Sequence, residues 1–89
     1  MLPQLLLVAL SPKDQAHVFL LGSFDTNDYN QASIFVDDSR FGALNDYKDR
    51  GFFLPAGTYT IEIRDDRERT LKRKTNVYLS TGETVAIEF

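Results

Sequence analysis

The chain has 89 residues, which is enough for one domain built around one hydrophobic core. It contains no cysteine, so disulfide bonds, thiol nucleophiles and thiolate metal sites are excluded. A formal net charge of -3 argues against nucleic acid or an anionic membrane surface as the main partner. No low-complexity tract or linker divides the chain, so residues 1–89 are expected to form a single domain.

The first ten residues, Met1 to Leu10, are almost wholly apolar. One interpretation is a secretory signal, whose apolar region typically has about 7–15 residues. However, no Lys or Arg precedes the apolar stretch, and the small-residue site Ala9-Leu10-Ser11 is followed at once by Pro12. The favoured prediction is a strand over Leu5 to Leu10 that is covered on both faces. No stretch of the chain approaches the roughly 20 apolar residues that a membrane-spanning helix needs.

The next part of the chain has the pattern of short strands separated by polar loops. The predicted strands are His17–Leu21, Ser33–Val36 and Arg40–Leu44, and the predicted loops are Gly22–Gln31 and Asn45–Arg50. The segment Asp37-Asp38-Ser39 is the turn that joins the second and third of these strands.

The second half alternates more regularly between apolar and polar residues, as antiparallel strands with one wet face do. The predicted strands are Thr58–Arg64, Thr70–Leu79 and Glu83–Phe89. The residues expected to be buried together are Tyr59, Ile61, Ile63, Val77, Leu79, Val85 and Ile87. Lys72 and Lys74 are expected on the opposite, wet face. Arg73 then falls in the apolar register, which a β-bulge would repair.

Two short connections containing glycine, residues 54–57 and 80–82, are predicted to be hairpin turns with a positive φ at Gly57 and Gly82. No window repeats apolar residues at helical spacing for long enough to predict a helix. The chain is therefore predicted to be all-β, as a small antiparallel β-sandwich or open barrel of seven to eight short strands.

Three segments resemble PEGA domains. They are LLLVALSPKDQAHVFL; IFVDDSRFGAL, where the family usually carries V-D-G-x-x-x-G; and FLPAGTYTIEI with the later VYLSTGETVAI. Asp38 stands where the family commonly has Gly, and the loop Gly22–Gln31 is an insertion. A related small domain of unknown function in bacterial lipoproteins accommodates this insertion better. Either resemblance implies a small β-sandwich on the periplasmic or extracellular side of a bacterial membrane.

Several surface residues are candidates for binding a ligand or partner. They are Asp25, Asn27, Asp28, Tyr29, Tyr47, Lys72 and Lys74. The acidic loop offers oxygen ligands but lacks the EF-hand pattern, so no metal is predicted. The two tyrosines fall in predicted loops, where aromatic rings either clamp the core or form a binding patch. The two lysines either protect an edge strand or bind an acidic partner.

The single histidine, His17, lies in an apolar strand without a neighbouring nucleophile or metal-ligand spacing, so neither catalysis nor a cofactor is predicted. The favoured hypothesis is a non-enzymatic binding or scaffolding module of bacterial cell-envelope type, with a protein or envelope partner. The alternative is a small carbohydrate- or ligand-binding β-domain that uses Tyr29, Tyr47 and the Asp25–Asp28 loop. The absence of tryptophan, the usual sugar platform, counts against this alternative.

Overall fold

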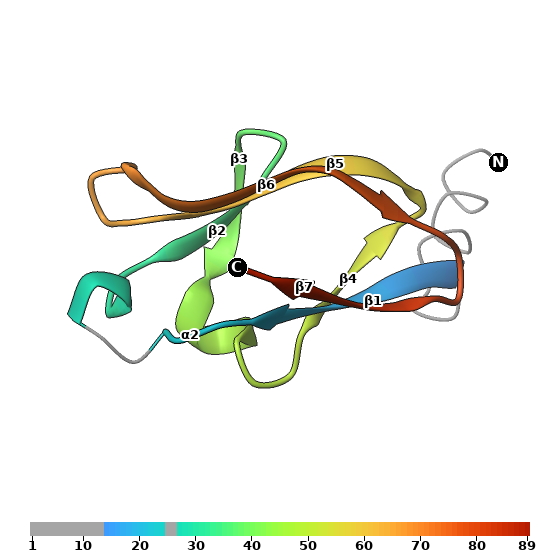
Figure 1. Cartoon of the computed structure of the whole chain (residues 1–89), viewed down its shortest axis with the longest axis horizontal. Helices are drawn as coiled ribbons and strands as arrows, with labels where there is room; N and C mark the ends of the chain where they lie inside the picture. Colours follow the sequence, from blue (N-terminus) through green and yellow to red (C-terminus); the bar gives the residue numbers. More distant parts are fainter. Residues whose placement is uncertain (1–13, 25–26) are drawn as a thin grey trace, which may run out of the picture.

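The computed structural model describes residues 14–24 and 27–89, which form two layers of β-sheet (Figure 1). The predicted strand over Leu5 to Leu10 and the candidate residue Asp25 lie outside the described residues. In chain order the elements are β1 (Gln15–Leu21), η2 (Asn27–Tyr29), β2 (Ser33–Val36), β3 (Ser39–Ala43), α2 (Leu44–Tyr47), β4 (Phe52–Pro55), β5 (Gly57–Arg64), β6 (Thr70–Leu79) and β7 (Thr84–Glu88). These strands in two open sheets confirm the all-β, sandwich-like prediction.

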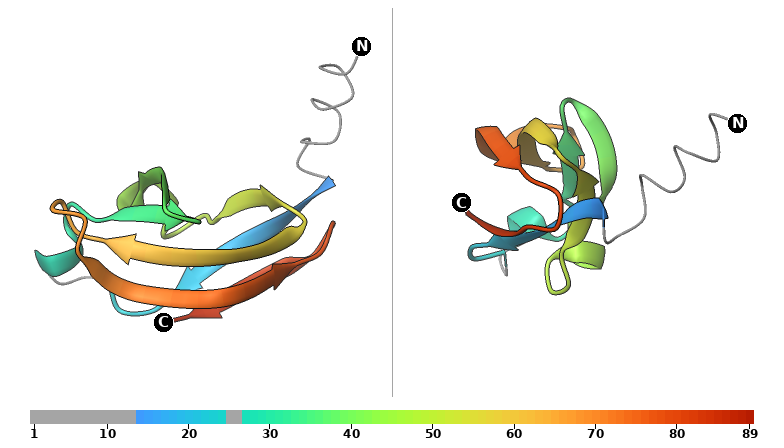
Figure 2. Two further views of the ribbon diagram at one scale, coloured as in Figure 1. Left: turned by 90° about the horizontal axis from the view of Figure 1, so that it is seen from above. Right: turned by 90° about the vertical axis from the view of Figure 1, so that its right-hand side faces the viewer.

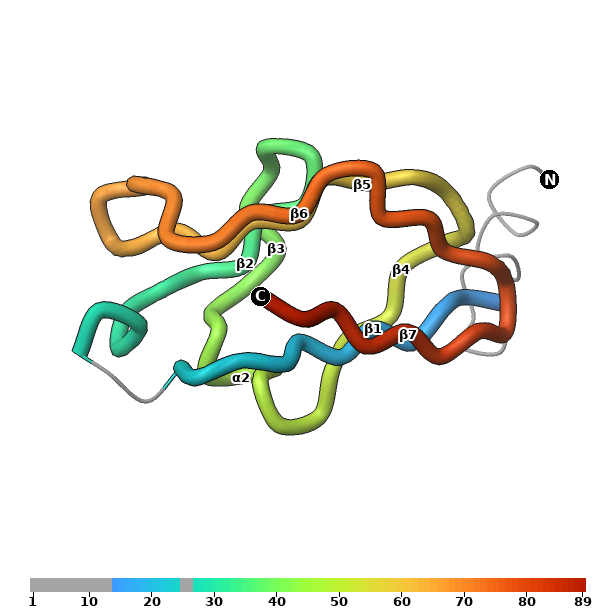
Figure 3. The backbone as a smooth tube through the Cα atoms, viewed as in Figure 1, coloured from blue at the N-terminus to red at the C-terminus, as the bar shows by residue number. Residues whose placement is uncertain are grey.

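The smaller sheet has the strand order β4-β1-β7, with β1 in the middle. β4 pairs antiparallel with β1, so that Phe53 lies opposite His17. β7 pairs with the other edge of β1 in parallel, with Ala86 opposite Phe19, whereas the sequence predicted antiparallel pairing. The parallel pair arises because β6 belongs to the other sheet, and residues 80–83 carry the chain across the sandwich (Figure 3).

The larger sheet has the order β3-β2-β5-β6, and all its pairs are antiparallel (Figure 2). The β2–β3 hairpin closes through Asp37 and Asp38, whose φ angles are 49° and 69°. Two successive positive φ angles are typical of a type I′ turn, whose twist matches that of the paired strands. This positive φ explains why Gly is common at the position of Asp38 in the family that the chain resembles. Aspartate tolerates a positive φ better than most residues do.

One hydrophobic core lies between the two sheets. Its buried members are Ala16, Val18, Leu20, Phe24, Ala32, Ile34, Leu44, Phe52, Leu54, Ile61, Ile63, Leu79 and Ile87. The seven residues predicted to be buried together all belong to this region: Ile61, Ile63, Leu79 and Ile87 are buried, and Tyr59, Val77 and Val85 pack partly buried against it. The prediction of the core-facing register is therefore confirmed.

β6 departs from its predicted alternation because its pairing with β5 shifts register twice. Each shift adds one residue to β6, as a β-bulge does, and reverses the face to which the following side chains point. Consequently Lys72 stands opposite Ile63 and Lys74 opposite Ile61, on the side of the sheet that carries the core. The bulges thus place both lysines on the same side of the sheet as these core residues, where Lys74 is still exposed and Lys72 is partly buried. A β-bulge of the kind suggested for Arg73 is present on either side of it.

Neither predicted hairpin turn is a hairpin. Residues 54–57 connect β4 to β5, and residues 80–82 connect β6 to β7, and each pair of strands belongs to different sheets. The φ angles of Gly57 and Gly82 are positive as predicted, at 157° and 79°, but only Gly82 has the left-handed conformation. The turn residues indicate where the chain bends, but they do not determine which sheet it joins next.

The predicted loop over Asn45–Arg50 overlaps a single helical turn, α2, whose first residue Leu44 is buried. After this turn the Gly51 N–H donates to the Tyr47 carbonyl at 2.8 Å, and Gly51 has a φ of 73°. A Cβ atom at Gly51 would lie 2.4 Å from the backbone oxygen of Val18. Only glycine therefore allows β4 to begin this close to β1.

The two left-handed glycines provide a matched test of this close approach. In Gly82→Ala the added Cβ meets no atom within 4 Å, so only the left-handed backbone penalty of about 1–2 kcal/mol is expected. Gly51→Ala carries the same backbone penalty, and in addition its Cβ clashes with the backbone oxygen of Val18. We expect urea unfolding to show a clearly larger loss of stability for Gly51→Ala. Equal losses in the two variants would contradict the close approach of β4 to β1.

Candidate functional site

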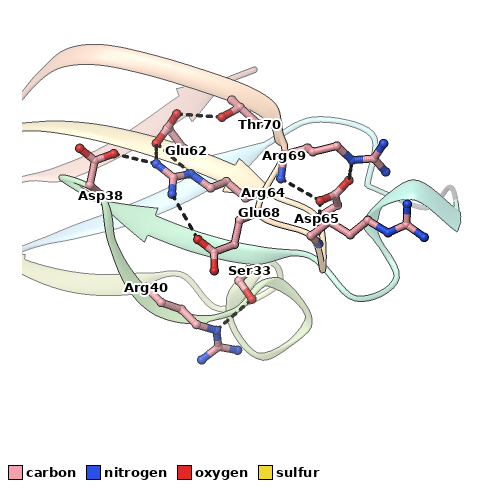
Figure 4. A network of polar contacts seen from close by, with 10 residues as sticks. Ser33, Asp38, Arg40, Glu62, Arg64, Asp65, Glu68, Arg69 and Thr70 are labelled. Carbon is pink, nitrogen blue, oxygen red and sulfur yellow. Dashed lines mark hydrogen bonds and ion pairs between the residues drawn. The ribbon is translucent and has the colours of Figure 1, made fainter.

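The outer face of the four-stranded sheet carries a closed network of charges around Glu62 (Figure 4). The alternation of Thr58–Arg64 predicts that Glu62, between the core residues Ile61 and Ile63, faces water, but it is only 5% exposed. Its carboxylate accepts hydrogen bonds from Nε of Arg64 at 3.2 Å and from Oγ1 of Thr70 at 3.1 Å. Arg64 also donates to Asp38 at 2.7 Å and lies 4.2 Å above the Phe35 ring. In the described part of the chain, no buried side-chain nitrogen or oxygen lacks a partner.

The charged side chains of this network are paired with one another. The hydrogen bond to Glu62 raises the pKa of the Arg64 guanidinium above its ordinary value, so Arg64 stays charged. Arg73 adds a longer contact, with Nε 3.8 Å from the Glu62 carboxylate. Because the buried carboxylate and the guanidinium satisfy each other, this arrangement holds β5 and β6 together and leaves no free buried charge for a ligand.

A second polar cluster closes the turn between β5 and β6. The Asp65 carboxylate accepts bonds from the backbone N–H groups of Arg67 at 2.9 Å and Arg69 at 2.8 Å, and from Nε of Arg69 at 2.8 Å. The Arg69 backbone bond is the main cause that lowers the pKa of Asp65 below its ordinary value. Asp65 is therefore committed to holding the turn in shape.

The outer face of the three-stranded sheet is mostly apolar instead, and its polar members are Thr84 and Glu88 of β7, opposite His17 and Leu21. The inner residues of β1, Ala16, Val18 and Leu20, are buried, so the residues between them point outward. We call the outward row the apolar face; its members are His17, Phe19 and Leu21 of β1, Phe53 of β4 and Ala86 of β7. Leu21 is 46% exposed and Phe53 is 40% exposed. These two side chains share the face with the partly buried rings of His17 and Phe19, and a continuous exposed apolar patch of this kind can mark an interaction surface.

His17 forms the centre of an aromatic stack on the apolar face. Its ring centroid lies 4.3 Å from that of Phe53, at an interplanar angle of 20°, and 4.3 Å from that of Phe19. Its Nε2 lies 3.0 Å from the Arg50 carbonyl, which can only accept, so this nitrogen carries the proton. The imidazole is therefore held in place by two phenyl rings and one backbone bond, and it acts as a structural part of the surface.

A shallow hollow of about 360 Å³ lies at the β4 border of the apolar face. Its lining residues are His17, Phe41, Tyr47, Arg50, Gly51, Phe52 and Phe53. Arg50 is exposed, and its guanidinium carbon lies 5.2 Å from the centre of the Tyr47 ring. The hollow thus combines aromatic walls with one accessible cation.

The predicted surface residues do not form one site. Asn27 and Asp28 line a groove of about 450 Å³ together with the β5–β6 turn. Tyr29 clamps the loop against the core, because its ring packs edge-on against Phe24 at 5.3 Å. Tyr47 packs against Phe41 and Phe52 and also lines the hollow. Lys72 and Lys74 lie on β6, in the other sheet from the apolar face.

No group of three or more His, Cys, Asp or Glu side chains that could hold a metal ion occurs among residues 14–24 and 27–89. The groove at Asp28 contains Asp65 and Asp66, but Asp65 is already occupied by the turn. The acidic residues of this groove are therefore explained by the hydrogen bonds that Asp and Asn commonly make to their own turns, and they do not indicate a ligand site.

His17 is partly exposed, as expected for a strand residue, but Phe19 and Phe53 were not predicted to lie beside it on one surface. The signal was present in the runs HVFLL and FFL, which are apolar at successive positions instead of alternating. A strand with apolar residues on both faces needs a cover on each side. Among the residues that the structure describes, the core covers one side of β1, and the other side stays partly exposed.

Comparisons of the chain with protein-family models, curated proteins and solved structures find no match.

The lowered pKa of Asp65 predicts how stability depends on pH. A carboxylate whose pKa is lower in the folded than in the unfolded state stabilises the fold above the unfolded pKa of about 3.9 and loses this effect as the pH falls. We expect Asp65→Asn to be less stable than wild type at pH 7, with a difference that shrinks between about pH 5 and pH 2. Urea unfolding at several pH values measures this difference.

Asp66→Asn is the matched control, because Asp66 is adjacent and exposed and does not accept the bonds that close the turn. It should follow the wild-type pH profile. A constant difference between wild type and Asp65→Asn across the pH range would show that the Asp65 charge does not stabilise the turn.

Proposed function

We propose that this domain is a non-enzymatic binding or scaffolding module of bacterial cell-envelope type, and that it binds a protein partner through the apolar face. The observation that carries the proposal is the contrast between the two outer faces. One face pairs its charged side chains around the buried Glu62, whereas the other leaves Phe53 and Leu21 substantially exposed. A partner would gain free energy by covering these side chains, at roughly 25 cal/mol per Å² of apolar area.

The geometry of His17 supports a binding role over a catalytic one. A general base needs a free nitrogen within hydrogen-bond reach of a reacting group. The Nε2 of His17 donates to the Arg50 carbonyl, which leaves the lone pair on Nδ1, and phenyl rings lie against the imidazole from β1 and β4. Among the described residues, no nucleophilic side chain is hydrogen-bonded to His17 that Nδ1 could activate.

The aromatic stack also favours a protein over a sugar as the partner. A pyranose ring packs on the face of an aromatic side chain, as a flat platform allows. In this domain the rings of His17 and Phe53 are stacked on each other, so each covers a face of its neighbour. The exposed part is a ridge of ring edges and aliphatic atoms, which suits the uneven surface of a protein.

Support for an envelope setting comes from the resemblance to PEGA domains. The resembling segments form elements of both sheets, and the aspartate that replaces the family glycine has a positive φ. Within the described residues, no helix is long and apolar enough to cross a membrane. From the resemblance alone, we propose that the module lies on the periplasmic or extracellular side and contacts an envelope protein.

Cosedimentation of the full chain with isolated bacterial envelope fragments tests the proposal. Phe53→Thr keeps a strand-forming residue but removes the exposed ring, and we expect it to weaken binding about tenfold or more. Tyr78→Thr is the control, because Tyr78 is 69% exposed on β6, in the other sheet. It should bind like wild type.

Two results would contradict the proposal. Equal binding by wild type and Phe53→Thr would show that the apolar face is not the binding surface. Undiminished binding to purified peptidoglycan free of protein, lost in Phe53→Thr, would replace the protein partner with a carbohydrate and favour the alternative function.

A further inference from the structure

Among the strands of residues 14–24 and 27–89, four sheet edges have no pairing partner, and they differ in how they are protected. β6 carries Lys72, Lys74 and two bulges, β3 has a register shift against β2, and β4 is short and ends at Pro55. Lysines, bulges, prolines and short length are the features that prevent an edge strand from pairing with another chain. β7, with the sequence TVAIE, has a regular register with β1 and contains no lysine, proline, glycine or bulge.

The backbone groups at the free edge of β7 follow from its pairing with β1. The His17 N–H donates to the Glu83 carbonyl at 2.8 Å, and the Phe89 N–H donates to the Leu21 carbonyl at 3.0 Å. In a parallel pair alternate residues point their N–H and C=O groups toward the same neighbour. Odd-numbered residues of β7 therefore bond to β1, and the N–H and C=O groups of Thr84, Ala86 and Glu88 point away from it.

The outward backbone groups of Thr84, Ala86 and Glu88 can pair with the same groups of a second β7 strand. If two β7 strands pair antiparallel about Ala86, Thr84 of one copy lies opposite Glu88 of the other. All three outward residues then fall at hydrogen-bonded positions, which gives about six backbone bonds across the edge. Val85 lies opposite Ile87 on the core side, where Val85 is only partly buried in the single chain. The small side chain of Ala86 lies at the two-fold axis and obstructs nothing.

We propose that β7 is a self-association edge, at which a second copy of this chain pairs antiparallel about Ala86 to form a two-fold dimer. The two three-stranded sheets then join into one continuous sheet in the order β4-β1-β7-β7-β1-β4. The apolar faces of the two copies lie side by side on this sheet, so the dimer presents a doubled surface. Closed two-fold pairing also removes the exposed edge, which agrees with the prevalence of such dimers.

Sedimentation velocity of the full chain over a range of concentrations tests the proposal with charge variants at one exposed position. Thr84→Lys places a cation opposite Glu88 of the second copy and should tighten the dimer about threefold to tenfold, because the contact occurs twice. Thr84→Glu places like charges together and should weaken it by a similar factor. Ala86→Pro removes the N–H at the axis, without removing a bond to β1, and should give a monomer.

The matched controls are Thr75→Lys and Thr75→Glu, because Thr75 is an exposed threonine on the edge strand of the other sheet. They should leave the dissociation constant unchanged. A chain that stays monomeric up to millimolar concentration, or a dimer that responds equally to both Thr84 charges, overturns the proposal. A monomeric chain that still binds envelope fragments through Phe53 would overturn the dimer alone and leave the binding function intact.

Discussion

The structure depends on the position of β1 between β4 and β7. β4 pairs with residues 15–18 of this strand and β7 pairs with residues 17–21, so β1 is held from both edges. Its alternating side chains therefore serve two different surfaces. Ala16, Val18 and Leu20 fill the core, and His17, Phe19 and Leu21 lie on the apolar face. Gly51 makes this arrangement possible at one edge, since a larger residue would collide with the Val18 carbonyl. The same strand thus links the stability of the domain to the surface that we propose for binding.

The strands of the second half could be predicted because period-two alternation reports directly on burial. Ile61, Ile63, Leu79 and Ile87 are buried as their spacing predicts. The pairing of the strands could not be predicted in the same way, because a glycine-containing turn serves equally well for a hairpin and for a crossing between sheets. β7 therefore reaches β1 in parallel, although its own sequence suits an antiparallel strand. The bulges in β6 were signalled only by the awkward register of Arg73.

The functional surface was harder to predict than the fold. Polar loop residues such as Asp28 were candidates because carboxylates can bind many kinds of ligand. In the structure Asp28 shares a groove with Asp65, whose carboxylate already accepts the hydrogen bonds of its own turn. Glu62 seemed to be an ordinary wet-face residue, and only the three-dimensional structure shows that Arg64 and Thr70 enclose it. The better signal was the absence of alternation in HVFLL, which indicates a strand with two apolar sides. That signal predicts a second surface needing a cover, but it does not identify the partner.

The central claim is that the outward ring of Phe53 serves binding and not the core. Phe53 and Leu54 are neighbours on β4, 40% and 6% exposed, and they point to opposite sides of the sheet. The free energies of unfolding of Phe53→Thr and Leu54→Thr in urea compare the two sides directly. We expect a loss of at least about 2 kcal/mol for Leu54→Thr and less than about 1 kcal/mol for Phe53→Thr. A loss for Phe53→Thr as large as that for Leu54→Thr would show that the apolar face is part of what holds the fold together, and would contradict the account.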